Sequence, residues 1–370
     1  MRITDVTVTH FEQRGIRELT FGPHNAPTNG TSTLGLVTLH TDEWLEGHAF
    51  LGSVTKSAEL DSLSLIQTLK PILLGRDPLD RERIHLDICK RFRSTTWRCI
   101  GAVDVALWDL AGKIAGLPIH RLVGGYRTSV PAYASSPGHA DVGDYVEEAL
   151  ETKARGYHAY KIHPPRKGWQ GDIEVCKAVR KAVGDGYRLM LDSTWMYTYT
   201  EALRVGRAIE EMGFYWFEDP LAEEDIYNCA KLRQKLDIPI LATEFSPGDF
   251  HAYAPWITAQ ATDYLRGDVA VKGGITACVK TAHLAEAFRM TFEIHHGGNS
   301  LNNVANLHVM CGIANSEFFE VILPDDVQKY GLVDDLVVDA QGMVQVPDRP
   351  GLGVQMDFDL IKSTTVAVLR

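Results

Sequence analysis

Residues 188 to 244 contain three short apolar strands that each end at or next to an acid: RLMLD (188–192), YWFED (215–219) and ILATE (240–244). The carboxylates Asp192, Glu218 and Glu244 follow one another at intervals of 26 residues. One strand, one helix and their two connections fit into such an interval, and this is the repeating unit of a parallel βα fold. The region therefore predicts an α/β fold in which the three acids lie at the same ends of neighbouring strands.

The same rhythm continues on both sides of this region. Five further segments have the strand pattern: VPAYAS (130–135), AYKIH (159–163), YLRGD (264–268), TFEIH (291–295) and EFFEVI (317–322). One marker residue near the end of each strand gives intervals of 22 to 30 residues; the markers are Tyr133, His163, Asp192, Glu218, Glu244, Asp268, His295 and Glu317. Eight such units predict a (β/α)8-type TIM barrel over residues 129–325.

The chain before and after the barrel has a different pattern. Residues 1–128 combine alternating strand segments with helical spacing, which predicts an α+β domain; these segments are 3–12, 33–50, 57–75 and 79–116. A polar, glycine-rich loop at residues 14–33 has the composition of loops that cover sites. Residues 326–370 return to strand and turn signals, and we expect this C-terminal segment to pack back toward the N-terminal domain.

The composition excludes several classes of protein. The 370 residues carry a formal net charge of −11 with a pI near 5.7, so no basic excess is available for a nucleic-acid backbone. No run approaches the ~18 apolar residues of a membrane span, and no apolar leader follows the first residue. The six cysteines form no CxxC pair, which predicts reduced thiols in a cytoplasmic protein; they are Cys89, Cys99, Cys176, Cys229, Cys278 and Cys311.

Asp192, Glu218 and Glu244 are the main candidates for a metal site. The carboxyl ends of barrel strands converge on one mouth, where functional residues lie in this fold. Three carboxylates at that place repel one another, and one would be protonated unless a cation is present. Each acid alone is also explained as a helix cap or a salt-bridge partner, but their equal spacing behind apolar strands favours a shared cation. Oxygen ligands without cysteine favour Mg²⁺, or Mn²⁺, over zinc.

Basic side chains end the flanking strands. Lys161 and His163 alternate with apolar residues and therefore face the same side of their strand. A solvated strand edge is the simpler explanation of this pair, and a site that takes protons or holds an anion is the functional one. Asp268 and His295 end neighbouring strands, where a carboxylate bonded to one ring nitrogen would fix the imidazole tautomer and raise its basicity. His296 is expected to face the opposite way because strand residues alternate.

These groups together predict proton transfer next to a carboxylate. A substrate carboxylate at the metal would have a basic group on either side. The metal would stabilise the negative charge of the enediolate that forms when the α proton leaves.

The motifs resemble the enolase superfamily, whose sites combine a Lys or His base with Mg²⁺, and within it the mandelate racemase subgroup. The resemblance covers nearly the whole chain and rests on GAVDVALWDLAGKIAGLPIHRLVGG (101–125), MLDST (190–194), FEDPL (217–221), ATEF (242–245), GDVAVKGGIT (267–276) and IHHGG (294–298). The related muconate cycloisomerase subgroup carries a lysine where Asp268 stands. The resemblance implies a capping domain over the barrel mouth, with residues 14–33 as a substrate lid.

The resemblance also implies roles for individual residues. The subgroup often has Lys-x-Lys at the end of the second strand; Lys161 matches the first lysine, and His163 stands where the second, the usual base, is expected. Glu317 resembles the acid of the eighth strand that hydrogen-bonds the substrate carboxylate, with Glu320 as the alternative. Substrate contacts are expected from His24, Asn25, Trp195, His296 and Glu320.

The expected activity is the Mg²⁺-dependent dehydration of an acid sugar, an aldonate or aldarate, to a 2-keto-3-deoxy acid. His163 would be the base, His295 the acid that protonates the leaving hydroxide, and Lys161 a neighbour of the substrate carboxylate. The opposite configuration at C2 would exchange the two histidines. A racemase, epimerase or cycloisomerase that uses the same enediolate is the alternative, and a catalytically silent sugar-acid binding protein is a third possibility. The resemblance also implies a homo-oligomer.

Overall fold

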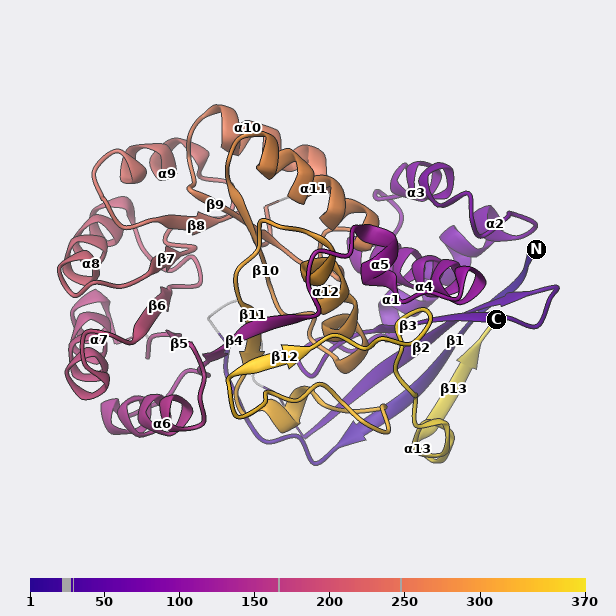
Figure 1. Ribbon diagram of the computed structural model, residues 1–370, viewed down its shortest axis with the longest axis horizontal. Helices are drawn as coiled ribbons and strands as arrows, with labels where there is room; N and C mark the ends of the chain where they lie inside the picture. Colours follow the sequence, from indigo (N-terminus) through magenta and orange to yellow (C-terminus); the bar gives the residue numbers. More distant parts are fainter. Residues whose placement is uncertain (22–27, 29, 166, 247) are drawn as a thin grey trace.

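The structure is a computed structural model of residues 1–370 and describes all of them except 22–27, 29, 166 and 247. Figure 1 shows two parts: a ring of strands surrounded by helices, and a twisted sheet with its own helices that holds both chain termini. Within the part of the chain that the structure describes, no helix is long and apolar enough to cross a bilayer.

Eight parallel strands form the ring, in the order β10-β9-β8-β7-β6-β5-β4-β11. Their bounds are β4 Ser129–Ser135, β5 Ala159–Ile162, β6 Arg188–Asp192, β7 Trp216–Glu218, β8 Ile240–Ala242, β9 Tyr264–Gly267, β10 Thr291–Ile294 and β11 Phe319–Ile322. The helices around them are α6 Val142–Ala154, α7 Trp169–Val183, α8 Tyr199–Glu211, α9 Ile226–Arg233, α10 Tyr253–Thr258, α11 Ile275–Ala287 and α12 Ser300–Gly312. All eight predicted strands are present, and the TIM-barrel prediction is confirmed.

A buried carboxylate joins the two end strands of this order, β10 and β11. Glu293 of β10 accepts hydrogen bonds from the backbone N–H groups of Glu317 (3.1 Å) and Phe318 (3.3 Å), just before β11. Burial, and then the nearby charge of Glu317, raises the pKa of Glu293 to about 7. The barrel is therefore nearly closed, and at this seam a buried side chain joins β10 to the residues that precede β11.

Large side chains fill the barrel beneath its mouth. Tyr133, Met190, Trp216 and Phe318 pack together in a separate apolar cluster with Ala159 and Leu241. Trp216 lies two residues before Glu218 on the same face of β7, and its indole N–H donates a 3.0 Å hydrogen bond to the Glu218 carboxylate. The acids at the mouth therefore stand on a packed aromatic layer, which fixes their positions.

The N-terminal part contains a four-stranded antiparallel sheet in the order β13-β1-β2-β3. Its strands are β1 Ile3–Arg14, β2 Thr31–Thr41, β3 Glu46–Leu51 and β13 Thr365–Leu369. Helices pack beside it: α1 Glu59–Ser64, a π-helical turn η1 Leu65–Leu69, α2 Lys70–Leu73, α3 Arg81–Cys89, α4 Trp97–Ala115 and α5 Ile119–Val123. Because β13 comes from the C-terminal end of the chain and pairs with β1, the first and last strands share one sheet.

The C-terminal segment reaches this sheet by way of the barrel. After η3 (Asp325–Gln328), strand β12 (Met343–Gln345) pairs with the barrel strand β4. The short helix α13 (Phe358–Ser363) then leads into β13, which pairs with β1. The segment therefore contacts both parts of the molecule.

Helical spacing continues without a break from 79 to 116, but the structure divides this stretch into α3 and α4. The chain turns between Cys89 and Trp97, and the Thr96 hydroxyl caps α4 by accepting a 3.3 Å hydrogen bond from the Cys99 N–H. A helix N-cap replaces the expected continuous helix because Thr96 adopts an extended backbone conformation.

Helix α4 holds the N-terminal part against the barrel. A Cβ atom at Gly101 would collide with the carbonyl oxygen of Val269, so only glycine allows this close approach. Asp104 accepts hydrogen bonds from the Thr276 N–H (2.9 Å) and hydroxyl (2.6 Å) at the start of α11. These contacts fix the loop between β9 and α11, which begins with Asp268.

Candidate active site

Asp192, Glu218 and Glu244 meet at the carboxyl ends of β6, β7 and β8. All three are buried, and one carboxylate oxygen of each lies within 4.8 Å of the other two. The sequence prediction that these acids come together therefore agrees with the geometry.

The loops next to these acids have strained backbones. Positive φ angles occur at the non-glycine residues Thr194 (49°) and Trp195 (61°) after β6, Asp219 (40°) after β7 and Thr243 (88°) after β8. Such conformations cost free energy and persist where the surrounding structure fixes them, typically at functional sites.

Lys161 links the acids to the eighth strand. Its Nζ lies 3.2 Å from Asp192 Oδ2, 3.0 Å from Glu218 Oε1 and 2.7 Å from Glu320 Oε1. Burial alone would lower the pKa of Lys161, but the surrounding carboxylates raise it well above its usual value. The three carboxylates around its Nζ favour the charged form of Lys161, which is suited to binding an anion.

Arg266 is a second buried cation in the site, which the sequence analysis missed. Its Nε lies 2.5 Å from Glu218 Oε1 and 3.3 Å from Glu244 Oε2, and its Nη2 lies 2.6 Å from Glu320 Oε2. The signal was present in YLRGD, because Arg266 is two residues before Asp268 and strand alternation places both on the inner face.

The charges of this centre are those of a divalent-cation site. The four carboxylates of Asp192, Glu218, Glu244 and Glu320 face the two permanent cations Lys161 and Arg266, which leaves two negative charges uncompensated. Burial raises the pKa of Glu218 and Glu244, although the charge of Arg266 acts in the opposite direction on both. An ion of charge +2 held by three carboxylates would remove the excess, and oxygen ligands suit Mg²⁺.

His163 lies beside the first of these acids. Its Nδ1 is 2.6 Å from the carbonyl oxygen of Ser136, and its Nε2 is 3.0 Å from Asp192 Oδ2. A carbonyl oxygen can only accept, so Nδ1 carries a hydrogen and Nε2 is the atom that can exchange a proton. Lys161 and His163 both line the central cavity, as their alternation predicted.

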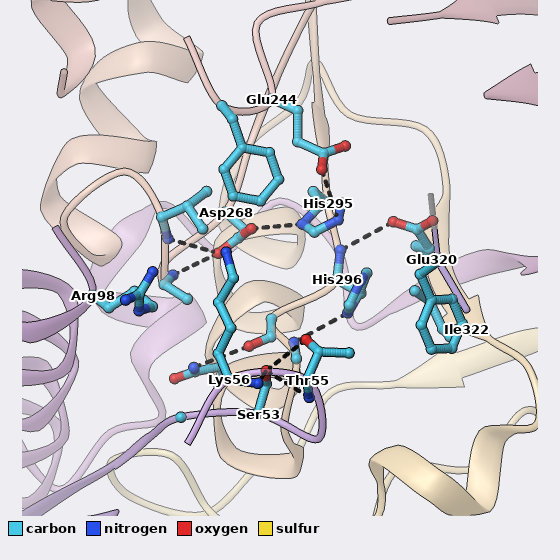
Figure 2. Close-up of a pocket in the computed structure, with 18 of the residues that line it drawn as sticks. Ser53, Thr55, Lys56, Arg98, Glu244, Asp268, His295, His296, Glu320 and Ile322 are labelled. Atoms are coloured by element: carbon cyan, nitrogen blue, oxygen red, sulfur yellow. Dashed lines mark hydrogen bonds and ion pairs between the residues drawn. The ribbon is translucent and has the colours of Figure 1, made fainter. Parts of the chain in front are cut away.

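His295 and Asp268 form the expected pair on the other side of the site. His295 Nδ1 lies 2.7 Å from Asp268 Oδ2, and its Nε2 lies 3.1 Å from Glu244 Oε1 (Figure 2). Burial raises the pKa of Asp268 to about 6 and lowers the pKa of His295 well below its usual value, so the expectation that Asp268 raises the basicity of this imidazole is wrong. The backbone N–H groups of Ala270 and Val271 donate to the other oxygen of Asp268 and hold it in place.

The prediction that His296 faces away from the site is wrong. Strand β10 ends at Ile294, so strand alternation no longer governs residues 295 and 296. Both rings line the same cavity with centroids 4.1 Å apart, and the His296 N–H donates to Glu320 (Figure 2).

The expectation that Glu317 lies at the barrel mouth is also wrong. Glu317 precedes β11, is exposed, and accepts a hydrogen bond from the Tyr215 hydroxyl just before β7. Glu320, the alternative, is buried inside β11 and contacts Lys161 and Arg266. The error concerns the start of the strand. Glu317 lies two residues before β11, whereas Glu320 lies within β11 and three residues closer to the carboxyl end of the strand.

Residues of the N-terminal part complete the cavity, whose volume is about 110 Å³. Ser53, Thr55 and Lys56 reach its rim from the loop after β3 (Figure 2), and Phe21 from the loop at 14–33 also lines it. Sequence patterns gave no reason to select the loop after β3. His24 and Asn25 lie outside the described residues, whereas Trp195 lines the cavity with its ring centroid 5.5 Å from that of Phe245.

Family models match both parts of the chain. The model described as "Enolase C-terminal domain-like" matches residues 144–360, and "Mandelate racemase / muconate lactonizing enzyme, N-terminal domain" matches residues 17–124.

Named relatives are similar along most of the chain. The crystal structure of D-glucarate dehydratase from Agrobacterium tumefaciens complexed with magnesium has a TM-score of 0.90 and 36% identity, and the match covers 99% of this chain and 100% of that one. Arabinonate dehydratase of Saccharolobus solfataricus is 31% identical over 79% of this chain and 80% of its own length. D-galactarolactone cycloisomerase of Agrobacterium fabrum is 31% identical over 80% and 83%. This protein is therefore an enzyme of the enolase superfamily and belongs to its mandelate racemase and muconate lactonizing enzyme family.

Proposed function

We propose that this enzyme dehydrates an acid sugar to a 2-keto-3-deoxy acid. The observation that carries the proposal is the pair of imidazoles that flank the acids. His163 Nε2 lies 3.0 Å from Asp192 and His295 Nε2 lies 3.1 Å from Glu244, on strands separated in the sheet by β6 to β9. A dehydration needs this arrangement, because one group removes the proton α to the carboxylate and another protonates the departing β-hydroxyl.

Each residue then has a defined task. Asp192, Glu218 and Glu244 would hold a Mg²⁺ ion, or Mn²⁺ as the expected substitute, and the ion would supply positive charge that stabilises a developing enediolate. Lys161 adds a fixed positive charge at the same place, and Glu320 holds Lys161 in position. These positive charges would stabilise the negative charge that develops on the carboxylate oxygens when the α proton leaves and the enediolate forms.

The two histidines divide the proton transfers. We assign His163 as the base and His295 as the acid that delivers a proton to the leaving hydroxide; because burial lowers the pKa of His295, this role requires the neighbouring carboxylates Asp268 and Glu244 to favour the protonated ring. Ser136 fixes the His163 ring through Nδ1, and Asp268 does the same for His295, so both Nε2 atoms are free of backbone partners for the exchange. A substrate of the opposite C2 configuration reverses these roles.

We further propose that the substrate is a diacid, an aldarate. Lys56 and Arg98 line the cavity from the N-terminal part, where Arg98 Nε also lies 2.6 Å from Asp61 Oδ2, and burial followed by the charge of Arg98 lowers the pKa of Lys56. The Lys56 ammonium beside Arg98 on the cavity wall favours a second carboxylate of the substrate there. The D-glucarate dehydratase and an L-talarate/galactarate dehydratase are named for aldarates, whereas the arabinonate and D-xylonate dehydratases are named for aldonates, so the choice of a diacid rests on the cavity and not on the relatives.

The test is a keto-acid assay of the purified protein with Mg²⁺ across aldonic and aldaric acids. A new 2-keto-3-deoxy acid from an aldarate supports the proposal. Exchange of the α proton in D₂O without a keto product would instead favour a racemase or cycloisomerase. Ligand binding without exchange or product would favour a silent binding protein. His163→Asn and His295→Asn should each abolish product formation while both variants still bind the substrate.

We also propose that the protein assembles as a homo-oligomer and takes a small anionic acid sugar as its partner molecule. Sedimentation equilibrium of the purified chain tests the first point, and a single species at the monomer mass would contradict it.

A further inference from the structure

A second group of metal-ligand side chains lies outside the active site, in a cleft between the N-terminal part and the barrel. The cleft has a volume of about 1040 Å³ and lies between α3 and the loop that follows β8. His85 and Cys89 stand one helical turn apart on α3 and therefore face the same side. Asp249 reaches the same place from the loop, and ligand atoms of all three residues lie within 4.8 Å of one another.

The geometry of the His–Cys pair suits a tetrahedral metal ion. His85 Nε2 lies 3.4 Å from Cys89 Sγ. Bonds of about 2.0–2.1 Å to nitrogen and about 2.3 Å to sulfur at a tetrahedral angle place these two atoms about 3.6 Å apart. The pair therefore already has nearly the separation that one shared ion would impose.

A buried carboxylate orients the histidine for this role. His85 Nδ1 lies 3.3 Å from Asp104 Oδ1, and Asp104 is itself fixed by its bonds to Thr276. A carboxylate behind the far ring nitrogen is the usual partner of a metal-binding histidine.

We propose that His85, Cys89 and Asp249 form a second metal site that binds Zn²⁺ or a similar borderline-soft divalent ion. A thiolate, an imidazole and a carboxylate select such ions, whereas the all-oxygen active site selects Mg²⁺. A water molecule or the exposed imidazole of His251, whose Nδ1 is 2.8 Å from Asp249 Oδ1, would complete the tetrahedron.

The position of the site gives it a structural consequence. Asp249 lies five residues after the active-site acid Glu244, on the loop that also carries Phe245 into the cavity. An ion shared with His85 and Cys89 fastens this loop to α3 of the N-terminal part. The inference goes beyond the proposed reaction and holds whichever acid sugar the enzyme uses.

Cobalt spectroscopy on the full chain, saturated with Mg²⁺, tests the site. Co²⁺ bound by a thiolate gives an intense near-ultraviolet charge-transfer band, which an all-oxygen site cannot produce. We expect the parent to show this band with the intensity of one Co²⁺–thiolate bond per chain, and Cys89→Ser to lose it. Cys99→Ser should keep the band and is the matched control, because the buried Cys99 thiol lies outside the cluster. Absence of the band in the parent, or its survival in Cys89→Ser, would overturn the proposal.

A measurement on the unsubstituted protein covers the case in which a variant does not fold. Zn²⁺ should slow alkylation of Cys89 by a maleimide at least tenfold, as read by mass spectrometry of the peptide that contains it. Zn²⁺ should also raise the Tm of the Mg²⁺-saturated parent. An unchanged alkylation rate at saturating Zn²⁺ would refute the site.

Discussion

Asp192→Asn should remove most of the stabilisation that Mg²⁺ gives the folded protein. A ligand at 100 times its Kd stabilises a protein by about 2.7 kcal/mol. For a chain of this size, each kcal/mol of added stability raises Tm by about 2 °C, so Mg²⁺ should raise the Tm of the parent by about 5 °C. Because the measurement needs no substrate, it tests the metal site separately from the reaction.

The loss of affinity follows from the charge that is removed. Two unit charges 4 Å apart interact by about 4 kcal/mol at an effective dielectric constant of about 20. Lys161, 3.2 Å from Asp192, offsets part of this attraction, so we take about 3 kcal/mol, or about 100-fold in Kd. At the same Mg²⁺ concentration the variant retains about 0.4 kcal/mol, a shift of about 1 °C.

The assay is differential scanning calorimetry with and without Mg²⁺, compared within each variant. Asp219→Asn is the matched control: Asp219 is also buried and directly follows Glu218, but it is not in the metal cluster. Its Mg²⁺ shift should equal that of the parent. An equal shift in Asp192→Asn, or an equal loss in Asp219→Asn, would show that these carboxylates do not hold the ion as we infer.

Three further predictions concern single side chains. Glu320→Gln should lower kcat/KM by about 100-fold or more, because Lys161 loses a charged partner. Glu317→Gln should change kcat/KM less than twofold. If steady-state kinetics show the reverse order, Glu317 and not Glu320 is the functional acid of the eighth strand. Lys56→Met should raise KM about tenfold for aldarates and little for aldonates, and an equal effect on both classes would exclude a distal carboxylate as its partner. Glu293 binds a proton more tightly in the folded state, so its contribution to stability is present below about pH 4.5 and is lost as pH rises to about 7. In urea titrations, Glu293→Gln should therefore reduce the difference in unfolding free energy between pH 4 and pH 8 by about 3 kcal/mol. An unchanged difference would contradict the raised pKa.

Local patterns were sufficient for much of the site because barrel geometry repeats. The 26-residue spacing of Asp192, Glu218 and Glu244 already placed the acids at one mouth, since every βα unit returns the chain to the same edge. Alternation along β5 correctly put Lys161 and His163 on one face. Both inferences require only local information: the order of neighbouring residues within one strand, or the length of one βα unit.

The errors occurred where a local rule was extended past the end of its element. Strand alternation predicts that His296 faces outward, but β10 ends two residues earlier. Spacing predicts Glu317 at the end of the eighth strand, but β11 begins at Phe319, and Glu320 lines the cavity. Periodicity identifies a strand more reliably than it identifies the residue at which the strand begins or ends.

The sequence by itself determined the barrel, the three acids and the Asp268–His295 pair, because strand alternation and the length of a βα unit are set by covalent geometry and local hydrogen bonding. Only the tertiary structure decided which charges share the centre: Arg266 against Glu218, Glu320 against Lys161, and Lys56 over the rim from the other part of the molecule. Those distances depend on how the sheet closes and on how α4 docks against the barrel, and residues far apart in the chain set both.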